Sequence, residues 1–316
     1  MSTELVPPPY DREIAPAFLA KFPNGNRMAG PADLSALRKA AAAGPAILEQ
    51  RDHVHRRDEA VHVGGNATVP VSVIQRSSRQ SSGPVIFHTH GGGMVAGNRW
   101  SGLAPFLQWV DEFDATLVTV DYRLAPEHPD PVPRSDAYAA MVWAARETAG
   151  GRRFFVAGQS AGGGIAAGLA LMARDLDGPR IDGQLLLSPM LDDRNSSVSA
   201  LQFDGTGGWD RGANAFGWES LLGPAHAREQ VPPYAAPARA QDLSGLPPAF
   251  LECGTAEVFR DETMAYAGRL WEAGNDAELH LWAGGFHRYD HLVPDSAVSK
   301  ATLSARTGWL QRRLNV

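Results

Sequence analysis

Short runs of β-branched and aromatic residues alternate with longer Ala- and Leu-rich stretches from about residue 52 onward. Continuous apolar runs of this kind are typical of strands buried on both faces of a parallel sheet. The pattern therefore predicts an α/β fold with a mostly parallel central sheet. The expected strands cover residues 52–63, 69–74, 85–88, 116–121, 154–157, 184–188, 249–253 and 278–282.

The intervening stretches carry apolar residues three and four positions apart, which is the spacing of one helix face. Helices are expected over 135–148, 163–175, 261–272 and 296–313.

Two stretches do not follow this alternation, and the second is rich in Gly, Pro, Trp and Asp. Connections longer than about 15 residues in a compact domain are usually lids or binding segments. The chain is therefore predicted to have an N-terminal cap segment (1–50), a core (51–189 and 247–316) and a second cap segment (190–246).

The sequence Gly158-Gln-Ser160-Ala-Gly162 lies between an expected strand and a helix rich in small residues. Glycine two positions before and after the serine allows a strand to reverse into a helix over one strained residue. Such a turn would present the Ser160 hydroxyl at the carboxyl end of the sheet. We therefore interpret Ser160 as a nucleophile. A phosphate-binding loop is the alternative, but a P-loop Lys-Ser/Thr ending and the G-x-G-x-x-G spacing are both missing here.

Three glycines follow His90, directly after another expected strand. Glycine lets the main chain approach a ligand closely and leaves N–H groups free to donate. Together with the N–H of Ala161, those of Gly92 and Gly93 are predicted to stabilise the oxyanion of a tetrahedral intermediate.

The base and the acid should follow late strands, because hydrolases of this architecture order the triad Ser, acid, His along the chain. His287 comes just after the last expected strand and is the predicted base. Glu257 lies in the loop after the penultimate strand and is the predicted acid. Asp192, which follows the preceding strand, is the rival acid. Asp261 and Glu262 fall in the first turn of a helix, where acidic residues are common as caps.

Composition narrows the possible partners. The chain has 316 residues, 35 of them acidic and 29 basic, with a formal charge of -6. Without a Lys/Arg run, nucleic acid is not an expected partner. No apolar run approaches the roughly 18 residues of a membrane span, and the N-terminus lacks the pattern of an export signal. Cys253 is the single cysteine, so no intrachain disulfide can form. A cytoplasmic protein is expected.

Five segments, in this order, resemble the hormone-sensitive-lipase-like esterases of the α/β-hydrolase fold, also called bacterial lipolytic family IV. They are His90–Gly93, Asp121–Pro129, Gln159–Gly163, Arg260–Glu262 and Gly285–His287.

The resemblance implies that Ser160, Glu257 and His287 form the triad, with Gly92, Gly93 and Ala161 as oxyanion donors. Two residues depart from the family pattern, which usually has aspartate before the nucleophile and as the triad acid. Here these positions are Gln159 and Glu257.

The expected function is a serine carboxylesterase that hydrolyses short-to-medium acyl or aryl esters and needs no cofactor. Family members often pair through the last strand, so a homodimer is compatible with the sequence. The cap segments are expected to shape the substrate pocket, and several aromatic or apolar residues could line it: Met94, Trp100, Trp209, Phe216 and Trp218.

Two alternatives remain open. One is a metal-dependent hydrolase that uses His88, His90, His287 and His291, although His88 should be buried in the sheet. The other is a non-catalytic ligand-binding member of the same fold, a kind of protein that typically lacks one member of the triad. All three members are present here.

Overall fold

A computed structural model describes residues 5–23, 31–49, 51–78, 83–224 and 230–314. Its centre is one eight-stranded sheet with the order β1-β2-β4-β3-β5-β6-β7-β8. The strands are β1 (Val54–Gly64), β2 (Ala67–Arg76), β3 (Val85–Thr89), β4 (Thr116–Val120), β5 (Phe154–Gln159), β6 (Gly183–Leu187), β7 (Ala249–Gly254) and β8 (Ala277–Trp282).

Only the two pairings of β2 depart from a parallel arrangement. β1 pairs antiparallel with β2, and β2 pairs antiparallel with β4. The other five pairings are parallel, so β3 to β8 end at the same edge of the sheet. This edge is where ligands bind in open α/β sheets, and both sequence motifs end strands there.

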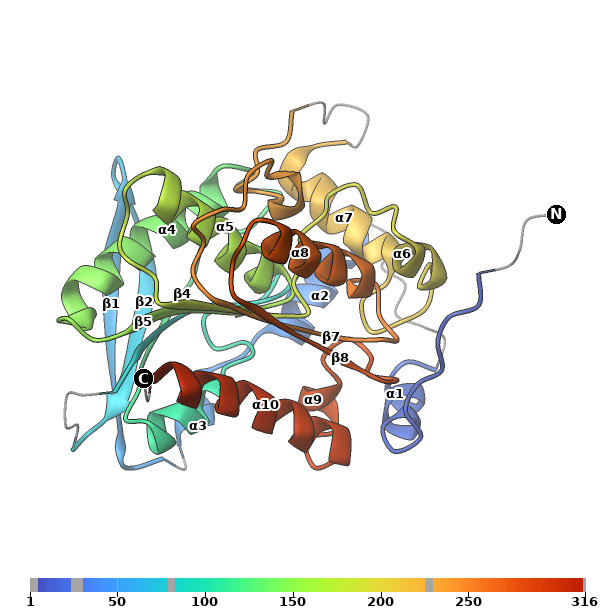
Figure 1. Ribbon diagram of the computed structural model, residues 1–316, viewed down its shortest axis with the longest axis horizontal. Helices are drawn as coiled ribbons and strands as arrows, with labels where there is room; N and C mark the ends of the chain where they lie inside the picture. Colours follow the sequence, from blue (N-terminus) through green and yellow to red (C-terminus); the bar gives the residue numbers. More distant parts are fainter. Residues whose placement is uncertain (1–4, 24–30, 50, 79–82, 225–229, 315–316) are drawn as a thin grey trace.

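Helices cover both faces of the sheet (Figure 1). On one face lie α3 (Ala104–Glu112) and α10 (Ala297–Leu314), and on the other lie α4 (Val132–Ala144), α5 (Ala161–Asp175) and α8 (Arg260–Glu272). Strands β3, β4, β5, β6 and β7 are buried along their whole length. Burial on both faces explains why their sequences read as continuous apolar runs.

The two segments outside the alternation contain short helices. The N-terminal one has α1 (Ala15–Lys21) and α2 (Leu34–Ala41), with 3-10 turns at Pro31–Asp33 and Pro45–Leu48. The later one has α6 (Val198–Gln202), α7 (Arg211–Leu222) and a 3-10 turn at Pro237–Arg239. A last short helix, α9 (Tyr289–Leu292), follows β8. No helix among the described residues has both the length and the apolarity needed to cross a bilayer.

The structure confirms the α/β-hydrolase prediction and places a strand at each of the eight expected positions. The four expected helices are also present, although α4 begins three residues earlier than expected and continues as a π-helical turn over Ala145–Ala149. Helix α3 was not among the four helices whose bounds were predicted. Its four buried residues, Phe106, Leu107, Trp109 and Val110, pack on the sheet within nine residues, too short a stretch for a clear helical period.

Candidate active site

Ser160 occupies the turn between β5 and α5 with φ of 60° and ψ of -126°. A non-glycine residue rarely adopts this conformation, which is characteristic of strained functional turns. The flanking glycines are required by space. A Cβ on Gly158 would lie 2.2 Å from the carbonyl oxygen of Gly162, and one on Gly162 would lie 2.0 Å from that of Thr89. The turn thus has the geometry that the sequence predicted.

The glycine loop after β3 lies against this turn. A Cβ on Gly91 would be 2.9 Å from the Gln159 carbonyl oxygen and 3.3 Å from the Ser160 Cβ. Gly92 and Gly93 both have positive φ, of 118° and 61°. Within the described chain, the N–H groups of Gly92, Gly93 and Ala161 donate no hydrogen bond. Three unpaired donors beside the serine are what an oxyanion site requires.

His287 and Glu257 are hydrogen-bonded to each other. The His287 Nδ1 lies 2.6 Å from Glu257 Oε2. The other carboxylate oxygen, Oε1, accepts hydrogen bonds from the Ser188 hydroxyl at 2.7 Å and from the Gly254 N–H at 3.2 Å. Both oxygens are therefore fixed, and the carboxylate holds the imidazole in one orientation.

The same contacts keep Glu257 ionised. Burial by itself would raise the pKa of this carboxyl, but the charge and hydrogen bond of His287, with hydrogen bonds from Ser188 and Cys253, outweigh it and hold the pKa below its usual value. A buried carboxylate facing one ring nitrogen stabilises a charged imidazolium.

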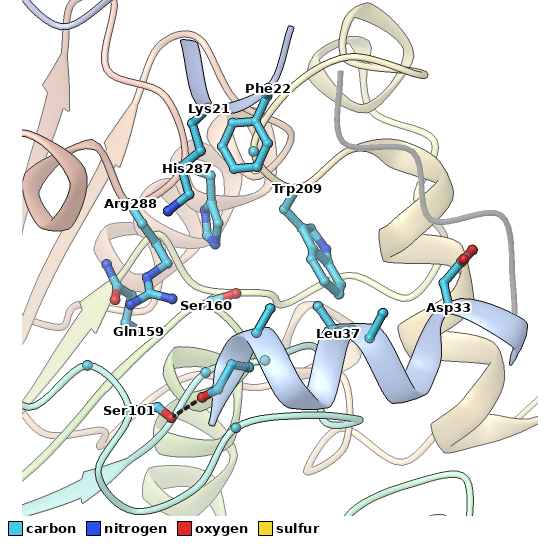
Figure 2. Close-up of a pocket in the computed structure, with 18 residues that line it drawn as sticks. Lys21, Phe22, Asp33, Leu37, Ser101, Gln159, Ser160, Trp209, His287 and Arg288 are labelled. Atoms are coloured by element: carbon cyan, nitrogen blue, oxygen red, sulfur yellow. Dashed lines mark hydrogen bonds between the residues drawn. The ribbon is translucent and has the colours of Figure 1, made fainter. Parts of the chain in front are cut away.

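Ser160 and His287 line one cavity of about 460 Å³ (Figure 2). Both side chains are largely buried, with 4% and 8% of the residue exposed. The two described side chains are not hydrogen-bonded to each other. Such contacts are often longer without substrate and tighten when it binds.

Residues from distant parts of the chain complete the cavity wall. The N-terminal segment contributes Lys21, Phe22, Asp33, Ala36, Leu37, Ala40 and Ala41, and the later segment contributes Gly208 and Trp209. Of the five aromatic or apolar residues that the sequence offered as possible pocket residues, only Trp209 lines the cavity. Met94, Trp100 and Trp218 are buried elsewhere in the packing, and Phe216 packs against the core.

The rival acid has a different partner. Asp192 is bonded to Arg194 through both carboxylate oxygens, at 2.7 Å each. Of the predicted acid Glu257 and its rival Asp192, only Glu257 is hydrogen-bonded to His287.

The two acids in the first turn of α8 do not cap that helix, contrary to the expectation. Asp261 instead accepts the N–H of Ser199, and Glu262 accepts those of Leu191 and Asp192. These hydrogen bonds connect the segment after β6 to α8. The position of the two acids in the first turn of a helix could not predict such long-range partners.

The histidines of the metal alternative are spread over several environments. His88 is fully buried in the sheet, as the sequence indicated, and its Nδ1 lies 3.0 Å from the Thr119 hydroxyl. The His90 ring stacks on Tyr122, with ring centroids 4.2 Å apart. No group of three or more His, Cys, Asp and Glu in the described part of the chain is arranged to hold a metal ion. The described residues therefore offer no set of ligands for the metal ion that this alternative requires.

Comparison with known proteins extends these observations. A family model described as an α/β hydrolase fold matches residues 86–291. The chain is 37% identical over 235 residues to esterase LipI of Mycobacterium tuberculosis, covering 71% of each protein. It is 36% identical over 249 residues to carboxylesterase NlhH of the same organism, covering 76% of this chain and 78% of the relative. The structure of a bacterial heroin esterase superposes with a TM-score of 0.85 at 33% identity, covering 97% of this chain and 98% of that one.

The chain belongs to the hormone-sensitive-lipase-like family of α/β-hydrolase esterases. It is a carboxylic ester hydrolase. The resemblance drawn from its motifs is thereby confirmed.

The predicted oxyanion donors of this esterase can be tested through Gly92. An alanine there would place its Cβ 2.2 Å from the Ala96 carbonyl oxygen, at a φ of 118°. The loop must shift, so we expect Gly92→Ala to lower kcat about 100-fold, the effect of losing one oxyanion donor. Steady-state hydrolysis of 4-nitrophenyl butyrate measures it.

Gly64 offers a matched control, because its φ is 120° and nothing lies within 4 Å of its added Cβ. Gly64→Ala therefore introduces similar backbone strain without displacing the loop, and kcat should stay within about twofold. Equal losses in the two variants would argue against an oxyanion role for the Gly92 loop.

Several residues in or next to the site of the esterase were not identified from the sequence. Ser188, directly after β6, holds Glu257, and its position at the carboxyl end of a strand was the available signal. Arg288 could have been noticed because it follows His287. Lys21 and Leu37 carried no local signal, because only the tertiary fold brings α1 and α2 to the cavity.

Proposed function

We propose that this esterase is a serine hydrolase that cleaves small carboxylic esters with Ser160, His287 and Glu257 through an acyl-enzyme. The observation that carries the proposal is the Glu257–His287 hydrogen bond of 2.6 Å at the wall of the cavity that also contains Ser160. A buried acid, an imidazole and a serine on a strained turn are the parts needed for nucleophilic acyl transfer.

In the proposed reaction, the Ser160 hydroxyl attacks the ester carbonyl while His287 Nε2 takes its proton. The tetrahedral oxyanion that forms accepts hydrogen bonds from the N–H groups of Gly92, Gly93 and Ala161. His287 then gives the proton to the departing alcohol, and the acyl group stays on Ser160. Water, deprotonated by His287, attacks this acyl-enzyme and releases the carboxylic acid and the free serine.

Glu257 keeps its charge through this cycle. Because its carboxylate accepts the Nδ1 proton, the Nε2 of His287 faces the serine without a proton and can act as the base. The orientation of Glu257 in turn depends on Ser188 and Gly254.

The cavity supports small substrates. Its volume of about 460 Å³ is near the lower end of the range for ligand pockets. Its apolar wall is formed by Trp209, Phe22 and the α2 residues Ala36, Leu37, Ala40 and Ala41. We infer that short-to-medium acyl or aryl esters fit best, and that the N-terminal and later segments act as the cap over them.

Covalent labelling separates this proposal from a binding protein of the same fold. A 4-nitrophenyl alkylphosphonate should add one phosphonyl group to Ser160, release one equivalent of nitrophenol and abolish ester turnover. Mass spectrometry of the intact protein and of its peptides identifies the site. Labelling elsewhere, or none at all, would discard the serine mechanism.

A further inference from the structure

We propose that this esterase prefers substrates that carry a negatively charged group, such as a carboxylate, held by Arg288 with help from Lys21. The inference rests on the proposed function, because it concerns the same cavity. It starts from the charged side chains that line that cavity: Lys21, Asp33 and Arg288.

Arg288 is placed to meet the substrate. It directly follows His287 and lines the cavity with it. Its backbone has φ of 64° and ψ of 31°, a left-handed conformation that few non-glycine residues adopt. Figure 2 shows its guanidinium extending toward Gln159, on the same side of the view as His287.

No carboxylate in the described chain pairs with Arg288. Its one side-chain contact is to the ring of His291, with Nη2 3.5 Å from Nδ1. The nearby carboxylate of Asp290 is instead engaged by Arg306, at 2.7 Å. Burial lowers the pKa of His291 to about 4, so this ring is neutral near pH 7 and adds no second charge there.

Gln159 is the second part of the argument. A Cβ on Gly102 would lie 3.7 Å from Gln159 Oε1 and 4.0 Å from His291 Cε1, so the Gln159 side chain and the Arg288 contact share one corner. Because residue 159 is a neutral glutamine, the side chain before the nucleophile cannot neutralise the guanidinium. The positive charge is left available to a ligand.

Lys21 contributes a second positive charge to the cavity. It ends α1, lines the cavity and has no ion pair with any described carboxylate. Figure 2 places Lys21 on the side of His287 and Arg288, and Asp33 on the opposite side. The two basic side chains thus lie on one side of the cavity and Asp33 on the other. A guanidinium recognises a carboxylate through two parallel hydrogen bonds, which favours this group among anions of similar size.

Matched ester pairs test the proposal. The first pair places the charge on the acyl side (4-nitrophenyl hemisuccinate against 4-nitrophenyl butyrate). The second places it on the alcohol side (4-acetoxybenzoate against 4-methylphenyl acetate). For each pair, the ratio of kcat/KM for the anionic to the neutral ester is compared between variants, so that intrinsic reactivity cancels.

In at least one pair, Arg288→Met should lower this ratio about tenfold, the usual effect of losing a charged hydrogen bond. Lys21→Met should lower it less, and 0.5 M salt should weaken the preference of the unaltered protein. Gln159→Asp should also lower the ratio by supplying an internal partner for Arg288. Arg146, an exposed arginine paired with Glu147, provides the control Arg146→Met, which should leave the ratio unchanged.

The two levels of inference fail in different ways. If Arg288→Met leaves both ratios equal to those of Arg146→Met, the anion preference is wrong while the serine mechanism stands. If the neutral esters are turned over equally well without Ser160, the mechanism itself is wrong. Loss of turnover of both esters in Arg288→Met, with their ratio unchanged, would also overturn the preference.

Discussion

Replacing Ser160 with alanine should lower kcat for 4-nitrophenyl butyrate by about 10⁶. In the proposed mechanism this side chain forms the acyl-enzyme, and its backbone conformation is imposed by the surrounding glycines. Without the hydroxyl, the proposed oxyanion donors and the cavity remain, so a small residual rate from binding and oxyanion stabilisation should persist. Such a decrease is measured by following nitrophenol release over long incubations with highly purified protein.

Ser77→Ala, at an exposed serine after β2, is the matched control and should keep full activity. The thermal unfolding midpoint of Ser160→Ala should be equal to or above that of the unaltered protein, because removing a functional side chain often relieves strain. A variant that keeps more than a hundredth of the activity, with its fold intact, would rule Ser160 out as the nucleophile.

Replacing Glu257 with glutamine should lower kcat by about 10³ to 10⁴. The glutamine Oε1 can still accept from Ser188 and Gly254, so the side chain should stay in place. Its amide would then face Nδ1 of His287 with a donor instead of an acceptor. The ring must keep its proton on Nε2, which can no longer take the proton of Ser160.

Asp192→Asn is the comparison, because this acid was the rival for the same role. Asp192 is paired with Arg194 on a partly exposed surface, so its loss should change kcat less than tenfold. Measuring kcat and KM separately is informative here: the Glu257 effect should lie in kcat. If Asp192→Asn proves the more damaging change, the acid has been misidentified.

The strands were predictable because their sequences are dictated by burial. The five central strands have no exposed position, so each reads as an unbroken apolar run. The edge strand β8 was also found, although its residues are only partly buried, because its apolar positions alternate. The turn residues around Ser160 were equally informative, because any side chain larger than that of glycine at residues 158 and 162 would collide with the backbone.

The cavity wall was less accessible to sequence reasoning. Trp218 and Met94 have the residue types that commonly line pockets, yet both are core residues. Conversely, Leu37 and Lys21 lie in short helices whose relation to Ser160 exists only after folding. Local patterns report on whether a side chain is buried, and they do not report on which distant surface it meets.

The separate origins of the proposed triad and of much of the cavity wall have a consequence for how selectivity can diverge. Ser160, Glu257 and His287 are carried by turns at the ends of sheet strands, whereas α1 and α2 supply five of the lining residues. Mutations in those two helices can change which substrates enter the cavity, while the proposed triad stays the same. Mutant libraries confined to the first fifty residues should therefore yield variants with new substrate ranges, most of which keep esterase activity.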